Sequence, residues 1–238
     1  MRRIWITPDT KLLRVGGRPP RVTLGLIALQ ATIFLLYVFA AGPSWVRQHL
    51  AVSAAATFGR GELWQPLTAV WLHLNARTLL LDLGVLWLLG APMERWWGER
   101  RFAACYLASG VGGLTAAAVL GLSRPSTLVC GATGGTLALL LAGAVVYGEH
   151  LVLWGQHTLG LRVRPTALIV GGAVLLLALV DRAWLDLTAA AVGAAIGASF
   201  LHPIARWAPG LRRRLRRRAR PALRSVGRRN DAPPHGPN

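Results

Sequence analysis

The chain alternates long apolar runs with shorter polar segments, many of them basic. Crossing a hydrocarbon core about 30 Å thick takes roughly 20 helical residues, and several runs reach or approach that length. The runs cover residues 22–41, 78–93, 102–122, 127–147, 167–180 and 184–201. They lack the apolar and polar alternation of barrel strands, and only helices or closed barrels satisfy their backbone groups in lipid. The pattern predicts an all-α membrane protein, a bundle of six transmembrane helices.

Positive charge is concentrated in alternate loops. The formal net charge is +18, and arginines gather before the first run and after the second, fourth and sixth. Cytoplasmic loops carry the excess of basic residues, so both termini are predicted to be cytoplasmic. The first run follows about twenty polar residues, which favours an uncleaved anchor over a signal peptide. We expect a basic N-terminal segment (1–21), a membrane domain (22–203) and an arginine-rich tail (204–238).

The arginine-rich tail is predicted to bind lipid. Leu211, Leu215 and Ala219 are four residues apart, so a helix would present a narrow apolar stripe to the bilayer. Contacts with the headgroups of anionic lipids are expected from Arg212, Arg213, Arg214, Arg216, Arg217 and Arg218. No recognition motif for nucleic acid accompanies this charge, so no nucleic-acid partner is expected. Proline and glycine in residues 231–238 predict disorder at the end.

Several ordered segments resemble the rhomboid family of intramembrane serine proteases. The segments are residues 62–73, 84–90, 93–102 and 106–113, the motif Gly131-Ala132-Thr133-Gly134, and the pair Gly193 and Gly197. Together they cover roughly residues 20–203 in the family's order. The resemblance implies the six-helix rhomboid fold and places Gly131 to Gly134 where the family has its catalytic Gly-x-Ser-Gly.

The same resemblance shows which catalytic groups are replaced. Rhomboids use a serine on the fourth helix as nucleophile and a histidine on the sixth as base, with a histidine and an asparagine on the second helix to bind the oxyanion. The corresponding positions hold Thr133, Asp186, Thr78 and Asp82. The family's Trp-Arg pair in the first loop is Trp64-Gln65. A hydroxyl needs a base whose pKa lies near neutrality, and an oxyanion needs donors, which an ionised aspartate lacks. We therefore expect no catalytic residues and no protease activity.

Acidic groups inside membrane spans usually face the bundle interior and mark function or a specific pairing. In a rhomboid fold, Asp82, Thr133 and Asp186 would converge in one cavity open to the non-cytoplasmic side. The main expectation is a neutral acid bonded to Thr78 or Thr133. A proton-sharing pair of acids, a cation held by both acids and His73, and proton transport stay open as alternatives. Separately, His73 is expected to cap the second helix or bond the first loop.

Small residues predict close helix packing. Gly193 and Gly197 form a Gly-x-x-x-Gly contact, and the expected neighbour within the fold is the stretch that contains Gly131 and Gly134. Cys105 and Cys130 fall inside apparent spans without the spacing of a zinc site, so no metal, redox group or other cofactor is expected.

These observations lead to one functional hypothesis. The protein is predicted to be an inactive rhomboid-like protein that binds transmembrane helices of partner proteins, as a scaffold, an assembly factor or a subunit of a membrane complex. The alternative is an active intramembrane endopeptidase that uses Thr133 or an Asp82/Asp186 pair. Because arginine greatly outnumbers lysine, a GC-rich bacterium and its inner (plasma) membrane are the expected source and location.

Overall fold

A computed structural model describes residues 12–15, 20–39, 44–154 and 157–201. Residues 1–198 form one compact unit, and of the second unit, 199–238, the structure describes only residues 199–201. The arginine-rich tail and its predicted lipid contacts lie outside the described residues, as do residues 1–11.

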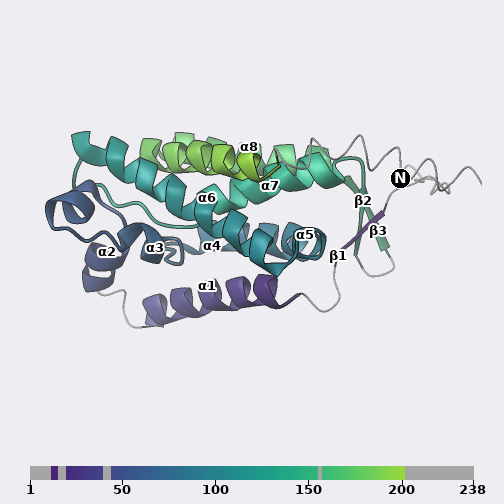
Figure 1. The fold of residues 1–238 in the computed structure, drawn as a ribbon, viewed down its shortest axis with the longest axis horizontal. Coiled ribbons are helices and arrows are strands. Elements are labelled where there is room, and N and C mark those ends of the chain that lie inside the picture. The colour runs from purple at the N-terminus through teal and green to yellow at the C-terminus, as the bar shows by residue number, and fades with distance from the viewer. Residues whose placement is uncertain (1–11, 16–19, 40–43, 155–156, 202–238) are drawn as a thin grey trace, which may run out of the picture. The chain divides into compact units, whose positions relative to one another are not determined.

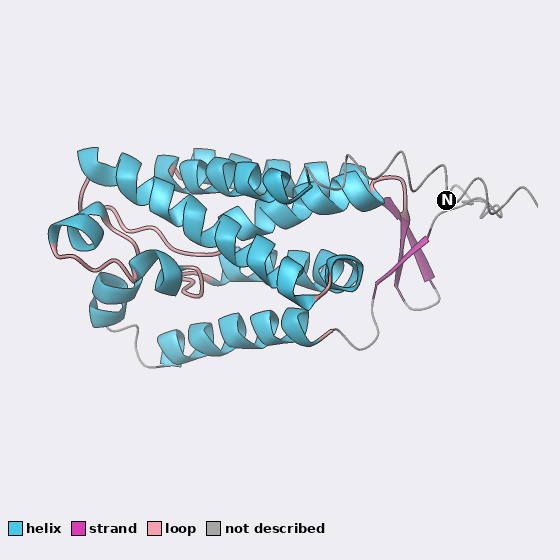
Figure 2. Cartoon of the chain, viewed as in Figure 1, coloured by secondary structure: helices cyan, strands magenta, loops and turns pink. Residues whose placement is uncertain are grey.

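Helices dominate the described chain (Figures 1 and 2). Their order is α1 (Arg21–Phe39), α2 (Ser44–Leu50), η1 (Ala55–Gly59), α3 (Gln65–Ala69), α4 (Ala76–Val85), η2 (Leu86–Gly90), α5 (Ala91–Trp97), α6 (Glu99–Leu120), η3 (Gly121–Ser123), α7 (Thr133–Tyr147), α8 (Val163–Val180) and a last helix, Trp184–Leu201. Among the described residues, five stretches are long and apolar enough to span a membrane: Arg21–Phe39, Ala76–Trp97, Glu99–Ser123, Val163–Val180 and Trp184–Leu201. The fourth predicted span is the shorter apolar helix α7.

That fourth span begins later than the apolar run predicts. Residues 127–132 are not helical, and α7 starts only at Thr133. Val129 forms an antiparallel bridge with Val52, and the N–H of Gly131 donates to the carbonyl of Ala69 at 2.9 Å. Gly131 has φ +106°, a conformation that glycine adopts without strain. The apolar segment thus pairs with the first loop before it enters the helix.

The mostly helical chain fits the predicted all-α bundle, and a small three-stranded sheet, which was not predicted, accompanies the helices (Figure 2). Strand β1 (Leu12–Val15) runs parallel to β2 (Leu151–Trp154), and β2 is antiparallel to β3 (His157–Arg162). Leu13, Leu151 and Val152 are buried. These strands have only four to six residues, too few for the apolar pattern of spanning segments to reveal them.

Glycines let the last helix lie close to α6 and α7. A Cβ atom on Gly193 would be 2.3 Å from the Cα of Gly134, and one on Gly197 would be 2.3 Å from the Cβ of Ala138. A Cβ on Gly113 of α6 would be 2.3 Å from the carbonyl oxygen of Ala189. A side chain at any of these positions would therefore force its neighbours to move. Gly131 has more room, since the three atoms nearest to a Cβ there belong to His73 and Thr133, each at 3.8 Å.

A buried carboxylate fixes the start of α1. Glu94 of α5 accepts from the backbone N–H of Val22 at 3.1 Å and from both the N–H and the hydroxyl of Thr23 at 2.7 Å. The first N–H groups of a helix have no partners within it, and a negative charge there is favourable. Gly90 faces Thr23, whose methyl group would lie 2.8 Å from an added Cβ. The contact joins α1 to the second spanning stretch.

Candidate functional site

The site begins at the start of α4, where Thr78 is held in a local cap. Asn75 is the N-cap residue, and its side-chain oxygen accepts from the N–H of Thr78 at 2.9 Å. The Thr78 hydroxyl lies 3.1 Å from the carbonyl oxygen of Asn75 and 3.0 Å from its side-chain oxygen. Asn75 therefore caps the helix, and the Thr78 side chain is bonded within this cap.

Asp82 lies one turn further along α4 and is 4% exposed. Its Oδ1 accepts from the Thr136 hydroxyl at 2.7 Å, and its Oδ2 accepts from the backbone N–H of Ala132 at 3.2 Å. Oδ2 also lies 2.9 Å from Nε2 of His73. The partner hydroxyl is therefore that of Thr136, and the expectation that Asp82 bonds Thr78 or Thr133 is wrong.

His73 binds Asp82 directly, which corrects the expectation that it would cap the second helix or bond the first loop. Both side chains are buried, with 0% and 6% exposed for His73 and Asp82. Nδ1 of His73 has no hydrogen-bond partner among the described residues. A neutral ring that donates from Nε2 leaves only a lone pair unsatisfied at Nδ1, which costs less than an orphaned N–H. We assign this tautomer from the hydrogen bonds.

Thr133 and Asp186 do not join this cluster. Thr133 is the first residue of α7, and Asp186 is half-buried in the last helix. Within the described ranges neither side chain forms a hydrogen bond or ion pair, either with the other or with Asp82. The described residues also contain no group of three or more His, Cys, Asp and Glu side chains that could hold a metal ion. The alternative of a cation held by both acids and His73 therefore has no site there.

Thr136 and the N–H of Ala132 are the partners that the sequence analysis missed. Thr136 is completely buried and lies one turn after Thr133 on the same helix. A buried acid needs donors from the helix that it faces, and the first turn of α7 offers two threonine hydroxyls. Asp82 bonds the hydroxyl of Thr136 rather than that of Thr133, because Thr136 faces the bundle interior.

A second polar cluster stabilises the first loop. Gln65, which replaces the family's arginine, is completely buried. Its side-chain oxygen accepts from the N–H of Ser53 at 3.1 Å and from the hydroxyl of Thr57 at 2.8 Å. Its amide nitrogen donates to Glu62 at 2.8 Å and to the carbonyl of Gln48 at 3.0 Å. The uncharged Gln65 side chain thus forms hydrogen bonds with both backbone and side-chain groups of the loop.

Glu62 completes that cluster. Its Oε1 accepts from Nε of Arg60 at 2.9 Å and lies 3.1 Å from Nδ1 of His49. The hydrogen bond from Arg60 is the main reason that the pKa of Glu62 is lowered, and the charges of Arg60 and His49 act in the same direction against the effect of burial.

Comparison with known proteins agrees with this architecture. Residues 60–206, more than half of the chain, match the Rhomboid domain. The chain is also 34% identical over 124 residues to Rhomboid protease GluP of Bacillus subtilis (strain 168). That alignment covers 51% of this chain and 24% of the relative, so the chain spans about a quarter of that protein's length. With its apolar helices and this match, the chain is an integral, multi-pass membrane protein that belongs to the rhomboid family.

Proposed function

We propose that this protein is a catalytically inactive rhomboid that binds transmembrane helices of partner proteins, as a scaffold, an assembly factor or a subunit of a membrane complex. The observation that carries the proposal is the hydrogen bond from the N–H of Ala132 to the carboxylate of Asp82. Ala132 directly precedes Thr133, the nucleophile position. A backbone donor beside the reacting atom is thus already satisfied by an internal anion.

This arrangement opposes acyl transfer in two ways. An oxyanion needs free donors, and the loss of a single one typically costs about 100- to 1,000-fold in rate. Here an acid stands where the family has a donor, and its charge would repel the oxyanion. A threonine hydroxyl also needs an adjacent base, and within the described residues Thr133 has no hydrogen-bonded one. The relative is named a protease, so an endopeptidase that uses Thr133 or an Asp82/Asp186 pair is the competing function.

The binding part of the proposal rests on exposed helix surface. In the membrane-spanning parts of α1 and α8, only 17% and 11% of the residues are buried within the protein. Helices associate in lipid through close packing rather than hydrophobic burial, and α8 carries Gly172, where a Cβ would meet nothing within 4 Å. These two spans offer room for partner helices. The proposed setting is a bacterial inner (plasma) membrane, with both termini cytoplasmic and the arginine-rich tail on anionic lipid.

The test is a purification of the intact protein in mild detergent, followed by mass spectrometry and by labelling with a fluorophosphonate probe. Stoichiometric membrane-protein partners and an absence of labelling are expected. Labelling that disappears in Thr133→Val but persists in the control Thr115→Val would overturn the proposal. Cleavage of a model transmembrane substrate that survives Thr133→Val and is lost in Asp186→Asn would instead establish the pair of acids.

A further inference from the structure

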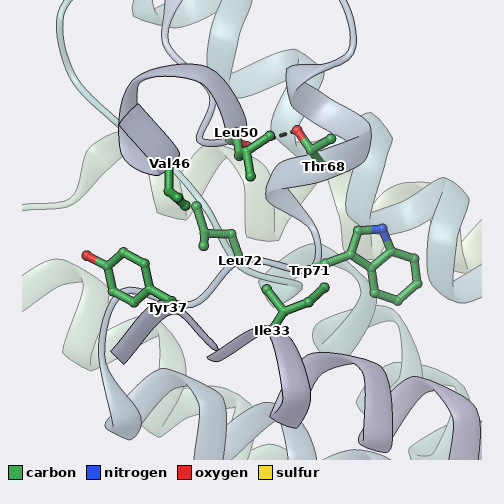
Figure 3. Close-up of a pocket in the computed structure, with 7 residues that line it drawn as sticks. All are labelled: Ile33, Tyr37, Val46, Leu50, Thr68, Trp71 and Leu72. Carbon is green, nitrogen blue, oxygen red and sulfur yellow. Dashed lines mark hydrogen bonds between the residues drawn. The ribbon is translucent and has the colours of Figure 1, made fainter. Parts of the chain in front are cut away.

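A cavity of about 210 Å³ lies between α1 and the first loop, apart from the Asp82 cluster (Figure 3). Its lining is almost entirely carbon. It is formed by Ile33 and Tyr37 of α1, Val46 and Leu50 of α2, and Trp71 and Leu72 after α3. The lining hydroxyl of Thr68 already donates to the carbonyl of Leu50 at 3.0 Å.

The nature of the lining limits what can fill this space. A buried water molecule needs two to four polar partners, which carbon walls do not supply. The wall formed by α1 belongs to a spanning helix that is mostly exposed, so the medium around it is hydrocarbon. The apolar lining and the surrounding hydrocarbon therefore match part of a hydrocarbon chain.

The short helix α2, which lines the cavity, also carries an arginine. Val46 and Leu50 are four residues apart on α2 and both line the cavity, so they share one face of this helix. Arg47 lies between them in sequence, is exposed, and has no ion pair or hydrogen bond with any described residue. Trp45 is 59% exposed on the same short helix, which follows the end of the α1 span. Tryptophan and arginine at that level are typical of the headgroup region.

We propose that the cavity binds one acyl chain of a phospholipid whose phosphate contacts Arg47. The apolar walls take the chain, and the guanidinium takes the anionic headgroup through charge-assisted hydrogen bonds. The bound lipid joins α1 to the first loop, in which Leu72 directly precedes His73 of the Asp82 cluster. This lipid site is independent of the proposed inactivity, because it shares no side chain with the Asp82 cluster.

The experiment uses the full chain in vesicles of phosphatidylglycerol that carries a diazirine on one acyl chain. After irradiation, the modified residues are mapped by mass spectrometry. The label is expected on the lining residues of α2 and on Trp71 and Leu72. Filling the cavity with Val46→Trp should abolish labelling there, and Arg47→Gln should lower it about 5-fold, the effect of one basic group at an anionic surface. The matched control, Ile169→Trp, lies on the exposed face of α8 and should leave labelling unchanged.

A second cavity-filling variant, Ile33→Trp, enters from α1 and covers the case in which Val46→Trp fails to fold. Equal labelling of the lining in the parent and in either folded cavity-filling variant would overturn the site. Labelling that is insensitive to Arg47→Gln, or as strong with a diazirine fatty acid as with the phospholipid, would overturn the headgroup assignment. Labelling of the exposed face of α8 with none on the cavity lining of the parent would show that the lipid does not enter the cavity.

Discussion

Nε2 of His73 and Oδ2 of Asp82 lie 2.9 Å apart in the interior of the bundle. The same Oδ2 accepts the N–H of Ala132, so the pair connects the first loop, α4 and the start of α7. A buried polar network of this kind strengthens the fold only while every member has a partner. Asp82, whose position the family resemblance assigns to oxyanion binding, is hydrogen-bonded here to His73, Ala132 and Thr136.

Asp82→Ala should destabilise the protein strongly. It would leave the ring N–H of His73, the N–H of Ala132 and the hydroxyl of Thr136 without their acceptor. Each buried orphan costs about 1–3 kcal/mol, so a loss of roughly 3 kcal/mol or more in unfolding free energy is expected in detergent. Asp181→Asn is the control, because this acid is 45% exposed in its ion pair with Arg77 and should cost at most about 1 kcal/mol. Equal losses of unfolding free energy in the two variants would show that the buried network stabilises the fold no more than an exposed ion pair does.

A serine at position 133 should not by itself make the protein react with a fluorophosphonate probe. Thr133→Ser removes the methyl group that stiffens the side chain, yet the position of the base still holds Asp186. Fluorophosphonate labelling is therefore expected only when Thr133→Ser is combined with Asp186→His and Asp82→Asn, which supply a base and an amide donor. Labelling of the single variant Thr133→Ser would contradict this, and would mean that a group already present acts as the base.

Gly193→Ala should disrupt the bundle. Its Cβ would lie 2.3 Å from the Cα of Gly134, and backbone on both sides would have to move. Overpacking of this kind costs about 1–3 kcal/mol. Gly172→Ala is the matched control, because nothing lies within 4 Å of its Cβ and alanine in a helix is favoured by about 0.5–1 kcal/mol. Unfolding in a graded mixture of detergents would compare them, and similar midpoints would refute the close contact.

Two features could be predicted from the sequence because they recur along the chain: the apolar runs and the spacing of the glycines. Spanning segments appear as apolar runs because lipid forces each one to satisfy its own backbone, and glycine spacing predicted that Gly193 would face the fourth helix. The late start of α7 was missed because residues 127–132 are as apolar as the helix that they precede. Val129 and Gly131 of this segment donate to Val52 and Ala69, which lie far away in sequence.

The partners of Asp82 could not be predicted for a related reason. The positions of Asp82 and Thr133 follow from the family resemblance, but choosing between the hydroxyls of Thr133 and Thr136 requires the rotation of α7 about its axis. That rotation is set by packing against the last helix at Gly134 and Gly193. His73 likewise joins Asp82 because the loop after α3 turns back toward α4.

Glu94→Gln should loosen the start of α1. The carboxylate accepts three hydrogen bonds from Val22 and Thr23, and bonds to a charged group contribute about 1.5–3 kcal/mol each. An amide has a single acceptor oxygen, so a loss of about 2 kcal/mol and faster proteolysis near residue 20 are expected. Glu99→Gln, an exposed acid on α6, serves as the control. If both variants unfold at the same temperature, Glu94 does not hold α1.

The first loop should lose stability in acid through Glu62. The pKa of this group is lowered in the folded protein, chiefly by the hydrogen bond from Arg60, relative to a reference of 4.5. The charged form is therefore favoured by folding. Its contribution is fully present above pH 4.5 and is lost as the pH falls below 4.5 through the lower folded pKa. The difference in unfolding temperature between the parent and Glu62→Gln should shrink over that range. A difference for Glu62→Gln that does not change between pH 6 and pH 3, roughly the range over which carboxylates titrate, would show that the Arg60 contact does not form in solution.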